Sequence, residues 1–246
     1  PHVILVDLKK RDKNSKKFIF PLKCPSCGSK TVKDFNEITK KQDAIRRCTS
    51  EGYDCEKIAI EKIKHFVSKE ALNIDGFGKK IVENFWKLKL IKLPQDIFNL
   101  NYNKIEELEG WGKLSVANLK FSIEEKRKIS LERFIYSIGI RHIGQENAKL
   151  IAKHVKSSEN FFKLHENNNI KNLSNIDGIG ETQINSIKNF FLNNTNIEVL
   201  LELNEHLLIT NAVSVNKNGS LKNKSFMLTG KLNNISRAEA KSLIEQ

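Results

Sequence analysis

The stretch Ile74-Asp-Gly-Phe-Gly78 is the first of four copies of one short pattern. The other three copies read Leu108-Glu-Gly-Trp-Gly112, Ile140-Arg-His-Ile-Gly144 and Ile176-Asp-Gly-Ile-Gly180. The last glycines of successive copies are 34, 32 and 36 residues apart. Because a fixed period of this size is typical of stacked supersecondary units, we expect the repeat to decide the fold.

Apolar residues recur at fixed distances from the last glycine of each copy. Position −4 is always Ile or Leu, and positions +4 and +7 are apolar in every copy. Residues three positions apart share one face of a helix, so a helix that buries this face is predicted after each glycine. The residue at −4 is expected to end a preceding helix. The residues at +4 and +7 are Val82, Phe85, Val116, Leu119, Ala148, Ile151, Ile184 and Ile187.

The Gly-x-Gly pair between the two helices is expected to form a tight hairpin. Glycine tolerates a positive φ and leaves no side chain in the way. The hairpin then presents backbone N–H groups at the N-terminus of the second helix, where anions such as phosphate bind. A lone Gly-x-Gly is equally typical of an ordinary helix end, but four copies with matching flanking residues favour the hairpin.

The third copy departs from the pattern because His142 replaces the first glycine. This hairpin is expected to serve packing, or to contact phosphate through the side chain of Arg141. The residues predicted to contact nucleic acid are Gly76, Gly78, Lys79, Lys80, Gly110, Gly112, Lys113, Arg141, Gly144, Gly178 and Gly180.

The composition is that of a globular protein with a basic surface. The chain has 246 residues, of which 39% are apolar and 29% are charged, and its net charge is +13. A balance this basic suits a polyanionic partner such as nucleic acid. With no apolar run of about 18 residues and no signal peptide, neither a membrane span nor secretion is expected. Met227 is the only methionine, so the sequence is expected to be a piece of a longer protein.

The four cysteines form two close groups, Cys24-x2-Cys27 and Cys48-x6-Cys55. Two such arms can point four thiolates at one centre, which predicts a tetrahedral zinc site. The site is expected to be structural, because four sulfurs leave no open position for water. Two disulfides are the alternative, and the lack of a secretory signal disfavours them. A segment this small cannot build its own core, so the metal should supply much of its folding free energy.

Five segments are expected along the chain. Residues 1–22 are predicted to be the end of a β domain, residues 23–57 the zinc finger, and residues 58–209 the four repeats. Residues 210–223 are rich in Asn, Ser and Lys and are predicted to be a linker. Residues 224–246 are expected to begin another domain.

Local patterns predict further elements within these segments. Trp86 and Trp111 are expected to pack in the core or against hairpins, with a DNA contact as the alternative for Trp111. Ser236 and Glu239 form a capping box at the start of the last helix. The expected strands are Val3–Leu8, Phe18–Phe20 and Ser225–Thr229, the expected helices are Ile58–Val67, Gln95–Leu100, Ser122–Ile129, Leu131–Ile138, Ile197–Leu208 and Ser236–Ile244, and the expected loop is Glu166–Asn172.

This order of segments resembles the C-terminal part of bacterial NAD-dependent DNA ligases. The resemblance covers nearly the whole chain. It is carried by Pro1-His-Val, Cys24-Pro-Ser-Cys27-Gly-Ser, His65-Phe-Val-Ser, Asn73-Ile-Asp-Gly, Phe134-Ile-Tyr-Ser-Ile-Gly-Ile-Arg141 and Leu228-Thr-Gly-Lys231. The sequence departs from the family after Cys55, where Glu56-Lys-Ile replaces a run that contains Ala-Gln.

The resemblance implies a mainly α-helical fold. It assigns residues 1–22 to the end of an oligonucleotide-binding (OB) domain and residues 23–57 to a Cys₄ zinc finger. Residues 58–209 become a tandem helix-hairpin-helix domain, and residues 224–246 the first strand and helix of a BRCT domain. That domain would lack its later elements.

The resemblance also implies an activity for the whole enzyme. Such ligases use NAD and Mg²⁺ to seal nicks between 3′-hydroxyl and 5′-phosphate ends of duplex DNA during replication and repair. Their adenylated lysine lies in a Lys-x-Asp-Gly motif, whereas Asn73 and Asn175 occupy that place in the two similar stretches of this sequence. No catalytic residue is therefore expected here. The implied role is to hold nicked duplex DNA, as a monomer in the bacterial cytoplasm, associated with the nucleoid.

Two other functions fit parts of the pattern. Helix-hairpin-helix arrays also occur in stand-alone DNA repair modules, although the cysteine segment before the array argues against this alternative. A scaffold of zinc finger and helical repeats that binds protein is the second alternative. It predicts no DNA affinity that depends on salt.

Overall fold

The computed structural model describes residues 7–16, 18–36, 39–212, 221, 224–230, 232, 235 and 237–245. The chain divides into two compact units, residues 1–50 and residues 51–246. Most of the strand expected near the N-terminus, most of the expected linker, Lys231 and the capping residue Ser236 lie outside the described residues.

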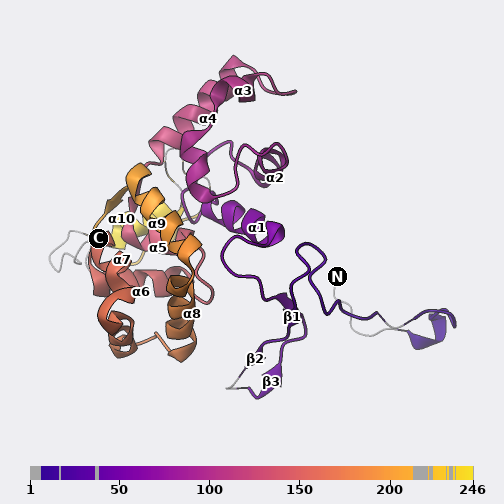
Figure 1. The fold of residues 1–246 in the computed structure, drawn as a ribbon. Helices are drawn as coiled ribbons and strands as arrows, with labels where there is room; N and C mark the ends of the chain where they lie inside the picture. The colour runs from indigo at the N-terminus through magenta and orange to yellow at the C-terminus, as the bar shows by residue number, and fades with distance from the viewer. Residues whose placement is uncertain are drawn as a thin grey trace. The chain divides into compact units, whose positions relative to one another are not determined.

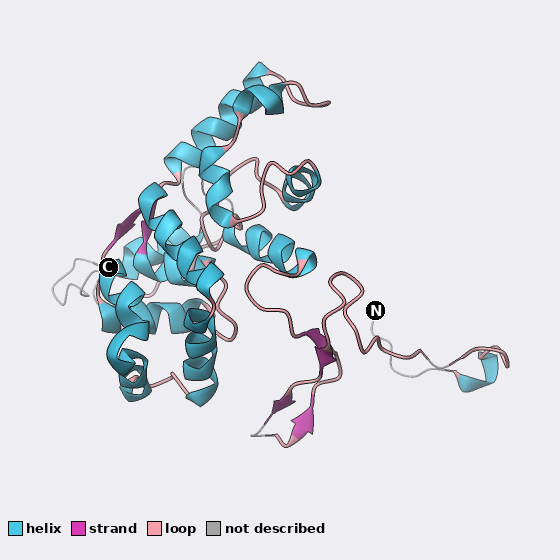
Figure 2. Cartoon of the chain, viewed as in Figure 1, coloured by secondary structure: helices cyan, strands magenta, loops and turns pink. Residues whose placement is uncertain are grey.

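The first unit has little regular structure (Figure 2). Its short strands pair antiparallel, β1 with β4 and β2 with β3. Hydrogen bonds of the buried Thr31 side chain hold the centre of this unit. Thr31 Oγ1 donates to the Pro21 carbonyl and accepts from Arg46 Nε. The elements are the 3₁₀ helix η1 (Leu8–Lys10) and the strands β1 (Thr31–Val32), β2 (Phe35–Asn36), β3 (Lys41–Gln42) and β4 (Arg47–Cys48).

Two predicted strands are wrong. Residues 18–20 and 224–230 are described and contain no strand. Phe18 and Ile19 are 72% and 81% exposed, so their apolar side chains are not buried as in a half-buried strand. A strand needs a partner to satisfy its backbone N–H and C=O groups, and the apolar pattern does not supply one.

The second unit is almost entirely helical (Figures 1 and 2). Its buried apolar side chains form one continuous cluster that runs from Ile60 to Leu207. None of the described helices is long and apolar enough to cross a membrane. The elements are α1 (Glu56–Phe66), α2 (Lys79–Lys87), η2 (Pro94–Asn99), α3 (Tyr102–Glu106), α4 (Lys113–Glu125), β5 (Lys128–Ser130), α5 (Leu131–Ser137), α6 (Gln145–Val155), α7 (Ser158–Phe162), η3 (Lys163–Asn175), α8 (Glu181–Leu192), α9 (Asn194–His206), β6 (Leu208–Thr210) and α10 (Arg237–Glu245).

All four repeats form the predicted turn and second helix. In each copy the N–H one residue before the last glycine donates to the carbonyl at position −4, and these bonds measure 3.0–3.3 Å. The helices α2, α4, α6 and α8 begin directly after the last glycine. The eight residues at positions +4 and +7 are all buried, as predicted. We number these hairpins 1 to 4 in chain order.

The first residue of each Gly-x-Gly pair has a positive φ. The angles are 78° at Gly76, 81° at Gly110 and 90° at Gly178. His142 takes the same conformation, with φ of 62°, although it carries a side chain. Turns that need a positive φ at their third residue favour glycine strongly. Hairpin 3 therefore keeps the geometry of the repeat at a cost in backbone strain.

The hairpins pack together in two pairs. In the first pair the ring of Phe85 on α2 lies 5.5 Å from the ring of Trp111 in hairpin 2. In the second pair His142 Nδ1 lies 2.9 Å from Ser186 Oγ on α8. Trp86 and Trp111 are partly buried against the core, which confirms their predicted packing role.

The segments around the hairpins differ from the predictions in four places. The predicted helix Ser122–Ile129 is wrong, because α4 runs unbroken to Glu125 and β5 follows it. β5 pairs in parallel with β6, which also shortens the predicted helix at Leu208. The first repeat has turns, rather than a helix, between α1 and Ile74.

The predicted loop Glu166–Asn172 is also wrong, since it lies within the 3₁₀ helix η3. Leu164, Ile170 and Leu173 are buried there. These positions differ by multiples of three, so they share one face of a helix with three residues per turn. Its asparagines suggested a loop, but the buried apolar face stabilises the 3₁₀ helix.

Gly52→Ala should destabilise the protein by about 2 kcal/mol. Gly52 has φ of 54°, where a side chain costs about 1–2 kcal/mol. A Cβ there would lie 2.9 Å from Asn193 Oδ1, which caps α9 by accepting from the Asn196 N–H. Urea unfolding of both proteins measures the difference.

Gly112→Ala is the matched control for this change. Gly112 has φ of −146°, and nothing lies within 4 Å of an added Cβ. Its free energy of unfolding should change by less than about 1 kcal/mol. Equal effects of the two substitutions would contradict the geometry described for Gly52.

Candidate nucleic-acid interface and metal centre

The residues predicted to contact nucleic acid all lie on the surface. Each hairpin exposes the two glycines of its Gly-x-Gly pair, or His142 and Gly144 in hairpin 3, and the basic residues of the prediction are exposed beside them. The structure brings them to the N-termini of α2, α4, α6 and α8. These termini carry backbone N–H groups without partners inside the helix, and a partial positive charge.

The last glycine of each hairpin is the N-cap residue of the helix that follows. Its backbone is extended in every copy, with ψ between 168° and 180° in magnitude, so its conformation does not require glycine. Nothing lies within 4 Å of a Cβ added at Gly78, Gly112 or Gly144. The missing side chain instead leaves these helix ends open to close approach from outside.

Charge distinguishes the four hairpins. The first turns of α2 and α4 contain no acidic residue. Lys79, Lys80 and Lys113 begin these two helices. The first turn of α6 contains Glu146, whose carboxylate accepts from Lys241 Nζ on α10 at 2.9 Å. Asp75, Glu109 and Asp177 occupy the same place in the turns of hairpins 1, 2 and 4. Hairpin 4 is the most acidic because Glu181 begins α8 with no lysine beside it. Hairpins 1 and 2 therefore attract an anion most strongly.

Two of the hairpins use their own side chains to satisfy an N–H group. The Gly112 N–H donates to Ser115 Oγ at 2.9 Å, and the Gly180 N–H donates to Gln183 Oε1 at 3.2 Å. In hairpin 1 the corresponding residue is Ile81, which has no acceptor. The sequence prediction missed Ser115 and Gln183, although a polar residue three positions after an N-cap is a known capping signal.

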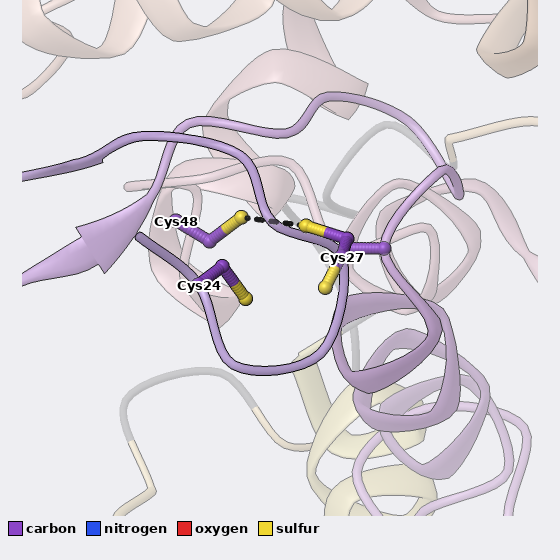
Figure 3. Close-up of side chains that lie close together, drawn as sticks. Cys24, Cys27 and Cys48 are labelled. Carbon is purple, nitrogen blue, oxygen red and sulfur yellow. Dashed lines mark hydrogen bonds between the residues drawn. The ribbon is translucent and has the colours of Figure 1, made fainter. Parts of the chain in front are cut away.

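The sulfur atoms of the four cysteines lie within 4.8 Å of one another. Figure 3 shows the Cys24, Cys27 and Cys48 side chains close together, with 3.4 Å between the last two sulfurs. Zinc–sulfur bonds of about 2.3 Å place the sulfurs of a tetrahedral site about 3.8 Å apart. The four cysteines could therefore hold a metal such as zinc, and these distances are too long for disulfides.

The surroundings of two of these thiols shift their pKa values in opposite directions. Hydrogen bonds from Ser29 lower the pKa of Cys27 to about 6. Burial is the largest influence on Cys48 and raises its pKa to about 12. Cys55 is the N-cap residue of α1 and is 1% exposed. A bound cation would stabilise all four as thiolates.

Residues 7–50 have almost no core of their own. Among the described residues of this segment, Thr31 is the only buried side chain, and it is polar. Arg47 pairs with Asp34 and Asp43 at 3.1 and 3.2 Å, but exposed ion pairs contribute little stability. The segment thus depends on other interactions for its fold, and four metal–thiolate bonds would supply them.

Part of the chain matches a known protein-family model. A family model described as a helix-hairpin-helix motif matches residues 133–200. This range includes hairpins 3 and 4. The predicted helix-hairpin-helix fold is therefore confirmed for the second pair, despite His142.

The whole chain is similar to one part of several proteins named DNA ligase. It is 78% identical to a DNA ligase of Pelagibacter ubique, over 100% of this chain and 36% of that protein. It is 40% identical to a DNA ligase of Rickettsia canadensis, over 100% of this chain and 36% of that protein. A DNA ligase of Wolbachia pipientis subsp. Culex pipiens is also 40% identical, over 98% and 36% of the two chains. The chain spans about a third of the length of these curated relatives and is homologous to that part of them.

Cys27→Ala should abolish metal binding by the four-cysteine site. Cobalt(II) bound by four thiolates gives a charge-transfer absorption, and we expect it to saturate at one metal per chain in the unchanged protein. Three remaining thiolates bind the metal far less tightly. Lowering the pH should remove the absorption too, because protons compete for the thiolates.

Ser26→Ala is the control for this substitution. Ser26 is exposed and lies next to Cys27, but contributes no sulfur. It should leave cobalt binding unchanged. Full cobalt absorption in the Cys27→Ala protein would contradict the four-thiolate site.

Proposed function

We propose that the chain is the DNA-holding C-terminal part of an NAD-dependent DNA ligase. The whole enzyme would seal nicks between 3′-hydroxyl and 5′-phosphate ends of duplex DNA, in replication and repair. This proposal is supported by the similarity of the full chain to proteins named DNA ligase. The observation that carries the DNA-holding role is the repeated, exposed helix N-terminus with an open glycine.

The hairpins hold DNA through backbone phosphates. N–H groups at the starts of α2, α4, α6 and α8 donate to phosphate oxygens, and nearby lysines and Arg141 add attraction. Hairpins 1 and 2 contribute most, because their first turns are basic and free of acidic residues. Such contacts position a duplex without reading its bases, as an enzyme that seals any sequence requires.

The chemistry of sealing belongs to residues outside this chain. NAD and Mg²⁺ act at that site, where a lysine accepts AMP. The Asn73-Ile-Asp-Gly and Asn175-Ile-Asp-Gly stretches form part of hairpins 1 and 4, and asparagine cannot form the phosphoramidate. We therefore expect the isolated chain to bind nicked DNA, as a monomer, without sealing it. The whole enzyme would work in the cytoplasm, at the nucleoid.

Zinc is the metal that we propose for Cys24, Cys27, Cys48 and Cys55. Four thiolates fill its tetrahedral coordination, so the site is structural. Its contribution is to order residues 7–50, whose own buried side chains are too few for an independent fold. The zinc site takes no part in the reaction.

Gly78→Ala should weaken binding to nicked duplex about tenfold. The added methyl group would stand on the open end of α2, where phosphate oxygens approach, and loss of one hydrogen bond to a charged group costs about 1.5 kcal/mol. Because no atom lies within 4 Å of the added Cβ, the fold should be retained. Fluorescence anisotropy at fixed salt measures the affinity, and circular dichroism checks the fold.

Gly180→Ala is the matched change in the most acidic hairpin. Its N–H already donates to Gln183 and Glu181 follows it, so we expect the smaller loss of affinity there. If Gly78→Ala, Gly112→Ala and Gly144→Ala together leave the affinity unchanged, the hairpins do not hold the DNA. Undetectable DNA binding by the unchanged protein would favour a protein-binding scaffold instead.

A further inference from the structure

A cavity of about 490 Å³, largely open to solvent, lies in the second unit, between α1 and hairpin 3. One wall belongs to α1 and the other to residues 139–143. His65 on α1 also bonds to α5, since its Nε2–H donates to the Tyr136 carbonyl at 2.8 Å. We call this cavity the seam pocket, and it is lined by Lys57, Ile58, Glu61, Lys62, His65, Gly139, Ile140 and Ile143.

The floor of the seam pocket is apolar. Ile140 and Ile143 are buried, and Ile58 is half-buried on α1. Gly139 adds no side chain to the wall and stands close to the His65 ring, since a Cβ there would lie 3.4 Å from His65 Cδ2. A pocket of this volume, apolar but with a few polar groups, is the usual form of a small-molecule site.

The mouth of the seam pocket is positively charged. Lys57 and Lys62 both line it, and Glu61 is the only carboxylate in the lining. Glu61 Oε1 lies 2.5 Å from Lys64 Nζ, which also pairs with Glu83 Oε1 at 2.7 Å. The two lysines therefore leave a net positive charge beside the apolar floor.

The charge of Lys62 is the less balanced of the two. Its Nζ lies 4.6 Å from the centre of the Tyr53 ring, and no carboxylate pairs with it among the described residues. Burial lowers the pKa of Lys62 to about 8. The ammonium group is thus partly removed from water, and only an aromatic ring replaces the lost hydration. A bound anion would balance its positive charge.

We propose that the seam pocket binds a small, flat apolar anion, with one carboxylate or phosphate held at Lys62 and an apolar body on the isoleucine floor. The site is separate from the DNA-holding role proposed above. A ligand there contacts α1 and hairpin 3 at once. Its binding therefore stabilises the second unit.

Calorimetric titration of the full chain with 2-naphthoate, AMP and inorganic phosphate tests this proposal. The first two combine an anion with an apolar body, whereas phosphate lacks the body and should bind at least tenfold more weakly. A preference for AMP over 2-naphthoate would identify a nucleotide as the ligand, and the reverse would identify a free organic acid. Either outcome supports the site.

Substitutions at the charged mouth complete the test. Lys62→Gln should lower the affinity for the better ligand at least tenfold, while Lys62→Arg keeps the charge and should retain most of it. Lys87→Gln, an exposed lysine of α2 outside the pocket, should have no effect. Affinity should fall as the pH rises above about 8, because Lys62 loses its charge there.

Two results would overturn the proposal. The first is the absence of binding by 2-naphthoate and AMP at millimolar concentration to the folded protein. The second is binding that Lys62→Gln leaves unchanged. Neither result bears on the DNA-holding role, which is measured separately with duplex DNA.

Discussion

A single turn, repeated four times, directs the helices of this protein. Each turn needs a positive φ two residues before its last glycine, and each is closed by one bond to the carbonyl at position −4. The turn reverses the chain so that positions +4 and +7 enter the core while the helix N-terminus stays outside. The buried face and the exposed N-terminus of each of these helices therefore follow from the same local geometry. Hairpin 3 shows how strong this constraint is, since His142 adopts φ of 62° to satisfy it.

The two units obtain their stability in different ways. The second unit buries one continuous apolar cluster, which includes both pairs of hairpins. Residues 7–50 bury only Thr31 among their described side chains, so metal–thiolate bonds would take the place of hydrophobic burial there.

Local patterns in the sequence predicted the repeats well, because each hairpin depends on residues within twelve positions of one another. The helices after Gly78, Gly112, Gly144 and Gly180 and the grouping of the four cysteines are confirmed. The sequence did not predict strands β5 and β6, because the pairing of Lys128 with Leu208 spans 80 residues. Each strand is also only three residues long, too short for a pattern of alternating residues. The seam pocket was missed for the same reason, as its two walls come from α1 and hairpin 3.

The central claim is that exposed helix N-termini hold duplex DNA by its phosphates. The most direct test is the affinity for two nicked duplexes of equal length and unrelated sequence, measured over a range of salt concentrations. One phosphate at each of four hairpins predicts a slope of about −4 in log affinity against log salt, the same for both sequences. A slope near zero, or affinities that differ widely between the two sequences, would contradict the account.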